Sequence, residues 1–110
     1  MLNIEKLKNE IVEQLKPLNP EEIILFGSFA SGTANEESDV DLFLLKDISE
    51  KEIRNYRFLA KKSLRNLQFK YKIGLDLFVD SRDRMEFRIS QIKDQFYDEI
   101  VKNGVVLYGK

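Results

Sequence analysis

The sequence predicts an α/β (α+β) fold in which helices pack on a small mixed sheet of three to four strands. Segments whose apolar residues repeat at helical spacing alternate with short runs of consecutive apolar residues, which are typical of buried strands. The alternation extends over 110 residues, of which 43% are apolar and 34% are charged. This composition argues against disorder and against a membrane protein, and the length fits one domain over residues 1–110.

Helix-breaking and helix-capping residues set the bounds of the predicted elements. Proline ends the first helix, because it excludes a helical residue before it and supplies no N–H donor. Ser49 and Glu52 form a capping box at the start of the longest helix. The predicted elements are a helix over 4–15, a strand over 23–26, one or two helical turns from 28, a strand over 40–45, a helix over 50–71, a strand over 75–79, a helix over 85–103 and a short edge strand over 105–108.

The chain contains neither cysteine nor histidine. Disulfides, thiolate and imidazole metal sites, cysteine nucleophiles and a Ser-His-Asp arrangement are therefore excluded. Any bound metal must take oxygen ligands, which points to magnesium, manganese or calcium.

The charge is nearly balanced, with 18 basic and 19 acidic side chains, a net charge of −1 and a pI of about 5.6. A generic DNA-binding protein carries a basic excess, so nucleic acid is not expected as the main partner. No apolar run approaches the roughly 20 residues of a membrane span, and the first residues do not form a signal peptide. We therefore expect a cytoplasmic protein without membrane association.

The junction at Gly27-Ser28 has the features of a phosphate site. A strand ends there, the glycine lets the backbone approach a ligand, and a short helix opens with its N–H groups and positive dipole end exposed. The pair alone is a weak signal, since a turn with a serine cap has the same sequence.

Three aspartates lie on predicted strands or at the entrance of one: Asp39 stands directly before the strand that contains Asp41, and Asp76 lies on a later strand. Side chains alternate along a strand, so Asp39 and Asp41 point to one face, and Asp76 lies in an apolar run where an unpartnered charge is costly. The alternative is that the first two are solvated edge residues. A divalent cation between the acids would offset their repulsion. Asp80 competes with Asp76 as the third ligand, but its place at the strand end suits a turn or a helix cap, so Asp76 is favoured.

Gly27-Ser28, the Asp39-x-Asp41 pair ten residues beyond it and Asp76 on a later strand together resemble the signature of the DNA polymerase β-type nucleotidyltransferases. More closely, LFGSFASG at 25–32 and SDVDL at 38–42 resemble the minimal nucleotidyltransferase (MNT) family. Residues 99–108 are similar to the ends of these proteins, so the resemblance covers nearly the whole chain. It implies the nucleotidyltransferase palm of the polymerase β-like fold.

The resemblance implies a mechanism and its residues. Asp39, Asp41 and Asp76 would be catalytic and would hold two Mg²⁺ ions, for which Mn²⁺ is a substitute. Gly27, Ser28 and Ser38 would bind the nucleotide, ATP. A nucleoside monophosphate, AMP, would pass to a hydroxyl acceptor, whose proton Asp76 or water would take. Catalysis would consist mainly of positioning and charge neutralisation.

The resemblance also implies a partner. MNT proteins commonly pair with a small helical HEPN protein, a ribonuclease toxin, and act as its antitoxin by transferring AMP to one of its tyrosines. One departure is Ser31, where many family members carry an arginine, so a cationic phosphate contact is missing or comes from elsewhere. Two alternatives stay open: a non-catalytic antitoxin that blocks its partner by binding, and a small-molecule nucleotidyltransferase that completes its pocket as a homo-oligomer.

Two further features are open to interpretation. The segment 51–72 is rich in lysine and arginine, which indicates either a solvated helix face or a docking surface for an acidic partner, for RNA or for the triphosphate. Five aromatic residues are expected to fill the core and not to form a base-stacking platform: Phe29, Phe43, Phe58, Phe78 and Phe87.

Overall fold

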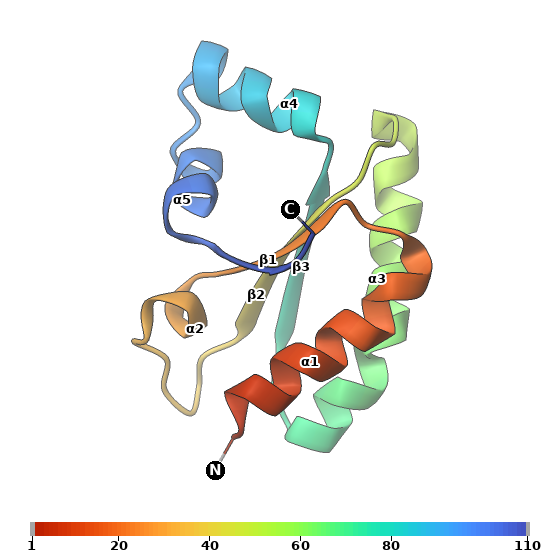
Figure 1. Cartoon of the computed structure of the whole chain (residues 1–110), viewed down its shortest axis with the longest axis vertical. Coiled ribbons are helices and arrows are strands. Elements are labelled where there is room, and N and C mark those ends of the chain that lie inside the picture. Colours follow the sequence, from red (N-terminus) through yellow and green to blue (C-terminus); the bar gives the residue numbers. More distant parts are fainter. Residues whose placement is uncertain (1, 110) are drawn as a thin grey trace.

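A computed structural model, shown as a ribbon in Figure 1, describes residues 2–109. It contains a four-stranded mixed sheet with the strand order β3-β2-β1-β4. The central strand β1 pairs antiparallel with both β2 and β4, whereas β2 and β3 are parallel. The strands are β1 (Glu22–Phe26), β2 (Val40–Leu45), β3 (Leu75–Asp80) and β4 (Val105–Tyr108). The expected small mixed sheet is therefore confirmed, with the C-terminal run as an edge strand.

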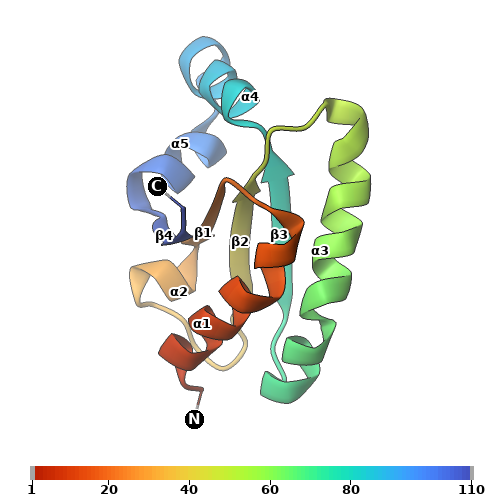
Figure 2. The same ribbon diagram turned by 45° about the vertical axis from the view of Figure 1, so that its right-hand side comes forward.

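Helices cover the two faces of the sheet unequally (Figure 2). Two long helices, α1 (Ile4–Leu15) and α3 (Glu50–Tyr71), pack on one face, and α4 (Arg82–Phe87) and α5 (Gln95–Asn103) lie on the other. The single turn α2 (Ser28–Ser31) follows β1 directly. Across residues 2–109, no helix combines the length and the apolar composition needed to cross a bilayer.

The core has two layers because strand side chains alternate between the faces. The larger layer, under α1 and α3, takes Ile23 and Leu25 from β1, for example, and Leu77 from β3. The smaller layer, under α4 and α5, contains Ile24, Phe43, Leu45, Met85 and Ile100. Along β2 and β3 the acidic residues alternate with residues of the larger layer. They therefore point to the opposite face, toward α4 and α5.

The predicted continuous helix over 85–103 is wrong. The structure has α4, then a π-helical turn over Arg88–Ile92, and then α5. Lys93 adopts a left-handed conformation with φ of 60°, and the Asp94 carboxylate accepts hydrogen bonds from the amides of Phe96 and Tyr97. The cap at Asp94 starts a new helix, which the apolar periodicity alone did not reveal.

The expectation that all five aromatic residues fill the core also needs correction. Phe43 is fully buried and Phe29 packs against the larger layer, but Phe58, Phe78 and Phe87 are exposed. Phe58 lies on the outer face of α3, and Phe78 lies on an edge strand whose face no helix fully covers.

Candidate functional site

Three sequence-predicted site residues meet at one end of the sheet. Gly27 follows the C-terminal end of β1, Asp41 lies at the start of the antiparallel β2, and Asp76 lies at the start of β3. In the strand register Asp41 is opposite Phe26 on one side and opposite Asp76 on the other. Since opposite residues share a face, the two carboxylates are direct neighbours on the α5 side.

Two glycines fit closely against the aspartates. Gly27 has a φ of 74°, and a β-carbon there would overlap the carboxylate of Asp41. A β-carbon on Gly74 would overlap the carboxylate of Asp39, and the Val40 amide donates to the Gly74 carbonyl at 2.9 Å. Any larger side chain at either glycine would displace an acidic group. The contribution of Gly74 was missed in the sequence, although a glycine directly before a strand is a sign of close backbone approach.

We call Asp39, Asp41 and Asp76 together the acidic group. Their electrostatics are unfavourable in the protein without a bound cation. Burial raises the pKa of Asp41, and the charges of Asp76 and Asp39, together with a hydrogen bond shared with Asp76, raise it further. Asp39 and Asp76 are exposed. Like charges this close are costly unless a cation or a proton offsets them.

We expect Asp41→Asn to stabilise the metal-free protein at neutral pH. An acid whose pKa is raised by folding loses stability as pH rises from its unfolded-state pKa through its folded-state pKa. The amide removes that loss, so the variant should melt above the wild type in chelator at pH 7. The two should converge below about pH 3.9, the ordinary pKa of aspartate. A variant that melts below the wild type at both pH values would contradict the repulsion.

Of the predicted phosphate-binding pair, Gly27 lies against Asp41, and Ser28 follows it in the chain. Ser28 begins α2, whose first-turn amides lack acceptors within the helix, as at any helix start. A cavity of about 520 Å³ opens beside this turn. It is lined by Phe26, Gly27, Ala30, Ser31, Glu99 and Asn103. Among residues 2–109, this lining includes no lysine or arginine that would replace the arginine that many family members carry at the position of Ser31.

Ser31 and Ser38 both have local partners. The Ser31 hydroxyl donates to the Ser28 carbonyl at 3.3 Å and lies 2.8 Å from the Thr33 hydroxyl. The Ser38 hydroxyl accepts from the Asn35 amide at 2.9 Å, and Ser38 lines a second cavity, of about 600 Å³, that does not include Gly27. The structure therefore shows Ser38 hydrogen-bonded within its own loop and lining a different cavity from Gly27.

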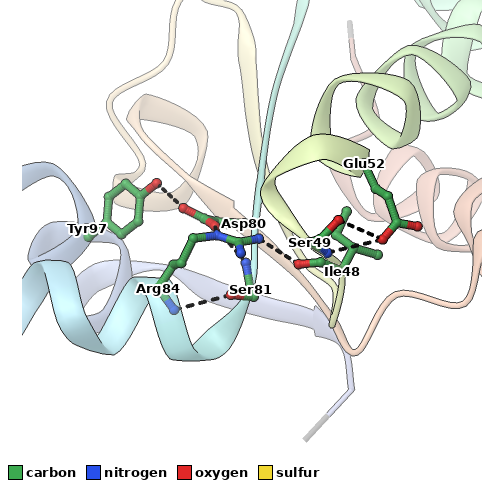
Figure 3. A network of polar contacts seen from close by, with 7 residues as sticks. All are labelled: Ile48, Ser49, Glu52, Asp80, Ser81, Arg84 and Tyr97. Atoms are coloured by element: carbon green, nitrogen blue, oxygen red, sulfur yellow. Dashed lines mark hydrogen bonds and ion pairs between the residues drawn. The ribbon is translucent and has the colours of Figure 1, made fainter.

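Asp80, the competing third ligand, belongs to a separate polar network (Figure 3). Its carboxylate accepts hydrogen bonds from Arg84, from the Tyr97 hydroxyl at 2.7 Å and from the Ser81 amide at 2.8 Å. Arg84 also donates to the Ile48 carbonyl at 2.7 Å. In the register Asp80 is opposite Leu45, four residues along β2 from Asp41. Asp80 is therefore occupied within its own network, and Asp76 stays the predicted third ligand.

The Asp80 network should stabilise the fold. Burial acts to raise the pKa of Asp80, but the hydrogen bonds from Tyr97, Arg84 and Ser81 outweigh it, so the pKa is lowered. We expect Asp80→Asn to lower the unfolding free energy by about 1–3 kcal/mol in urea titrations at neutral pH, because it leaves donors unpaired. The loss should shrink as pH falls through the lowered pKa, where the wild-type carboxylate is itself protonated. Equal stability of variant and wild type at neutral pH would contradict this role.

The acidic group can be tested for fit to a divalent cation. Asp41 and Asp76 are opposite each other in the strand register, and burial and the charges of Asp76 and Asp39 raise the pKa of Asp41. Within residues 2–109, however, no three ligating side chains meet closely enough to form a ready-made metal centre. The donor set is all oxygen, as Mg²⁺ and Mn²⁺ prefer, so the chemistry of the residues fits such an ion.

The basic helix lies away from this group. α3 packs on the opposite face of the sheet from Asp41 and Asp76 (Figure 2), and Arg57 donates from it to the Leu77 carbonyl at 2.7 Å. Lys70 pairs with Glu10 of α1 at 2.9 Å. Binding of the triphosphate by the body of α3 therefore does not agree with the fold, whereas Lys72, at the end of the helix, lines a cavity together with Ser38.

Comparison with known proteins bears on the chemistry. Residues 4–107 match the family model described as Nucleotidyltransferase domain. The chain is 31% identical over 110 residues to the Methanocaldococcus jannaschii protein named "Putative protein adenylyltransferase MJ0604", covering 97% of this chain and all of that one. It is 40% identical over 65 residues to "Putative protein adenylyltransferase MJ1305" of the same organism, covering 56% of this chain and 42% of that one.

Solved structures share the fold. A Sulfolobus solfataricus protein described as a putative nucleotidyltransferase matches with a TM-score of 0.62 at 19% identity, over 96% of this chain and 83% of its own. A chain of the mutant toxin-antitoxin complex MntA-HpeT matches with a TM-score of 0.60 at 21% identity, over 99% and 75%. A chain of a toxin-antitoxin structure with AMP-PNP matches with a TM-score of 0.58 at 21% identity, over 94% and 73%.

Proposed function

Since the chain belongs to the nucleotidyltransferase domain family, we propose that it transfers AMP from ATP to a hydroxyl group in a Mg²⁺-dependent reaction. The observation that carries this proposal is the pair of neighbouring carboxylates, Asp41 and Asp76, beside the Gly27-Ser28 turn. The name of the relative MJ0604 supports an acceptor on a protein.

Each residue of the site has a distinct task in this reaction. Asp39, Asp41 and Asp76 would hold Mg²⁺, which when bound neutralises the triphosphate and makes the acceptor hydroxyl more acidic. The Gly27 backbone and the Ser28 hydroxyl bind the β- and γ-phosphates and fix the α-phosphorus near the carboxylates. Ser38 contributes by keeping the loop before Asp39 in place.

The transfer itself exchanges one phosphorus–oxygen bond for another. The acceptor oxygen forms a bond to the α-phosphorus, the bond from that phosphorus to the oxygen of the β-phosphate breaks, and pyrophosphate leaves. The hydroxyl proton passes to the Asp76 carboxylate or to water, since the sequence offers no imidazole. Asp76 is exposed on an edge strand, where a large acceptor has access to it.

The acceptor we propose is a tyrosine of a helical HEPN-type toxin, with this chain as the antitoxin. Support comes from the toxin-antitoxin complexes among the structural neighbours, one of them with AMP-PNP. The test is to incubate the chain with ATP, Mg²⁺ and the protein that co-purifies with it, and to locate AMP on the partner by mass spectrometry. AMP on a tyrosine is expected, and it should be absent from a partner whose tyrosine is replaced by phenylalanine. An unmodified partner that is nevertheless neutralised would favour blocking by binding.

A further inference from the structure

Three phenylalanines form a cluster on the sheet face that carries Asp41 and Asp76. Phe26 ends β1, Phe78 lies in β3 and Phe96 lies in the first turn of α5. Ring centroids are 5.1 Å apart for Phe78–Phe96, 5.6 Å for Phe26–Phe96 and 5.7 Å for Phe26–Phe78. We call these three side chains the aromatic cluster.

Two rings of the aromatic cluster reach the surface instead of filling the core. Phe78 is 37% exposed and Phe96 is 41% exposed, whereas Phe43, on the strand between β1 and β3, is 1% exposed. Contiguous exposed apolar surface of this kind marks binding sites more often than scattered single residues do.

The aromatic cluster is continuous with the acidic group. Phe26 is opposite Asp41 in the register, and Phe78 follows Asp76 by two residues on the same face, about 7 Å along the strand. A ligand held at the carboxylates of Asp41 and Asp76 therefore lies beside the aromatic rings, which occupy neighbouring positions on the same face of the sheet. Phe26 also lines the cavity beside Gly27 and so connects the rings to the proposed phosphate site.

We propose that the aromatic cluster stacks the base of the bound nucleotide; this rests on the proposed function above. The base is joined to the α-phosphate through the ribose alone, so it must lie close to the carboxylates that position that phosphate. A planar base has a π-face that packs on phenylalanine rings, and such stacking needs no matching hydrogen bonds. Phe78 and Phe96 are the accessible rings and are the positioning residues for the base.

The test compares Mg²⁺–ATP with Mg²⁺–tripolyphosphate, which has a triphosphate chain and no base, by isothermal titration calorimetry. The wild type should bind ATP at least about tenfold more tightly than tripolyphosphate. Phe96→Ala should weaken ATP binding by about tenfold, the order found when a stacking aromatic side chain is removed, and leave tripolyphosphate binding unchanged. Phe78→Ala should act in the same direction, and Phe96→Tyr, which retains a ring, should bind ATP like the wild type.

Two controls separate stacking from folding. Phe69→Ala removes a phenylalanine that is 77% exposed on α3, behind the sheet, and should change neither affinity. Phe96→Leu keeps apolar bulk at this position of α5 without a ring, so it should lose ATP affinity while its melting temperature stays near that of the wild type.

The outcomes are separable. Equal wild-type affinities for ATP and tripolyphosphate, or unchanged ATP affinity in both alanine variants, would overturn the assignment of the base. Normal ATP binding with a loss of AMP transfer to the partner would show that the cluster holds the acceptor instead, and would also overturn it. A protein that binds neither ligand with Mg²⁺ would overturn the proposed function itself.

Discussion

Asp41→Asn is expected to abolish nucleotide transfer while leaving the fold and partner binding intact. Asp41 lies between Asp76 and the Gly27 backbone, so in the proposed reaction its charge would act on the cation that also binds the phosphates. Loss of one such electrostatic group should cost at least roughly 10²–10³-fold in rate. The measurement is the initial rate of AMP incorporation into the partner, with partner binding followed separately.

Asp47→Asn is the matched control for this prediction. Asp47 is exposed just beyond the other end of β2, so the same chemical change there should leave the rate unaltered. If the Asp41→Asn protein neutralises its partner as fully as the wild type does, antitoxin action does not depend on the chemistry, and simple blocking is the better account.

Saturating Mg²⁺–ATP is expected to raise the melting temperature by about 10 °C or more. A ligand that binds only the folded state stabilises it by about 2.7 kcal/mol at a hundredfold excess over Kd. Each kcal/mol moves the midpoint of a domain of about this size by roughly 4–8 °C. The gain should be large here because a bound cation would offset both the burial and the repulsion by Asp76 and Asp39, which raise the pKa of Asp41.

Neither ATP in chelator nor Mg²⁺ alone should match that shift, because the triphosphate and the aspartates both need the cation between them. Ser28→Ala should weaken the shift, and Asp39→Asn should remove nearly all of its metal-dependent part. A melting curve that does not respond to Mg²⁺ with any of the four nucleoside triphosphates would leave a binding-only antitoxin as the better reading.

Much of the site could be predicted from the sequence because strand geometry is regular. Alternation predicts that Asp39 and Asp41 share one face, and the parallel register of β2 and β3 brings Asp76 next to Asp41. The ends of strands are also where Gly27 and Gly74 allow the backbone to approach a carboxylate.

Features that depend on tertiary packing were not predictable in the same way. The break before α5 comes from the Asp94 cap, which competes with an apolar periodicity that continues through it. Alternation places Phe78 on the face of Asp76, but its exposure depends on how α5 lies over the edge of the sheet. Asp80 is hydrogen-bonded by Arg84 and Tyr97 (Figure 3), and these two residues become its neighbours only when α4 and α5 fold back over the strands.

The most direct test of nucleotidyl transfer is to supply ATP labelled either at the α-phosphate or at the γ-phosphate, with Mg²⁺ and the co-purifying partner. The account predicts that the α-label becomes covalently attached to the partner, that the γ-label is released as pyrophosphate, and that Asp41→Asn abolishes both. Attachment of the γ-label would show a phosphoryl transfer, and retention of both labels in unreacted ATP would show that the chain does not catalyse the transfer; either result would contradict the account.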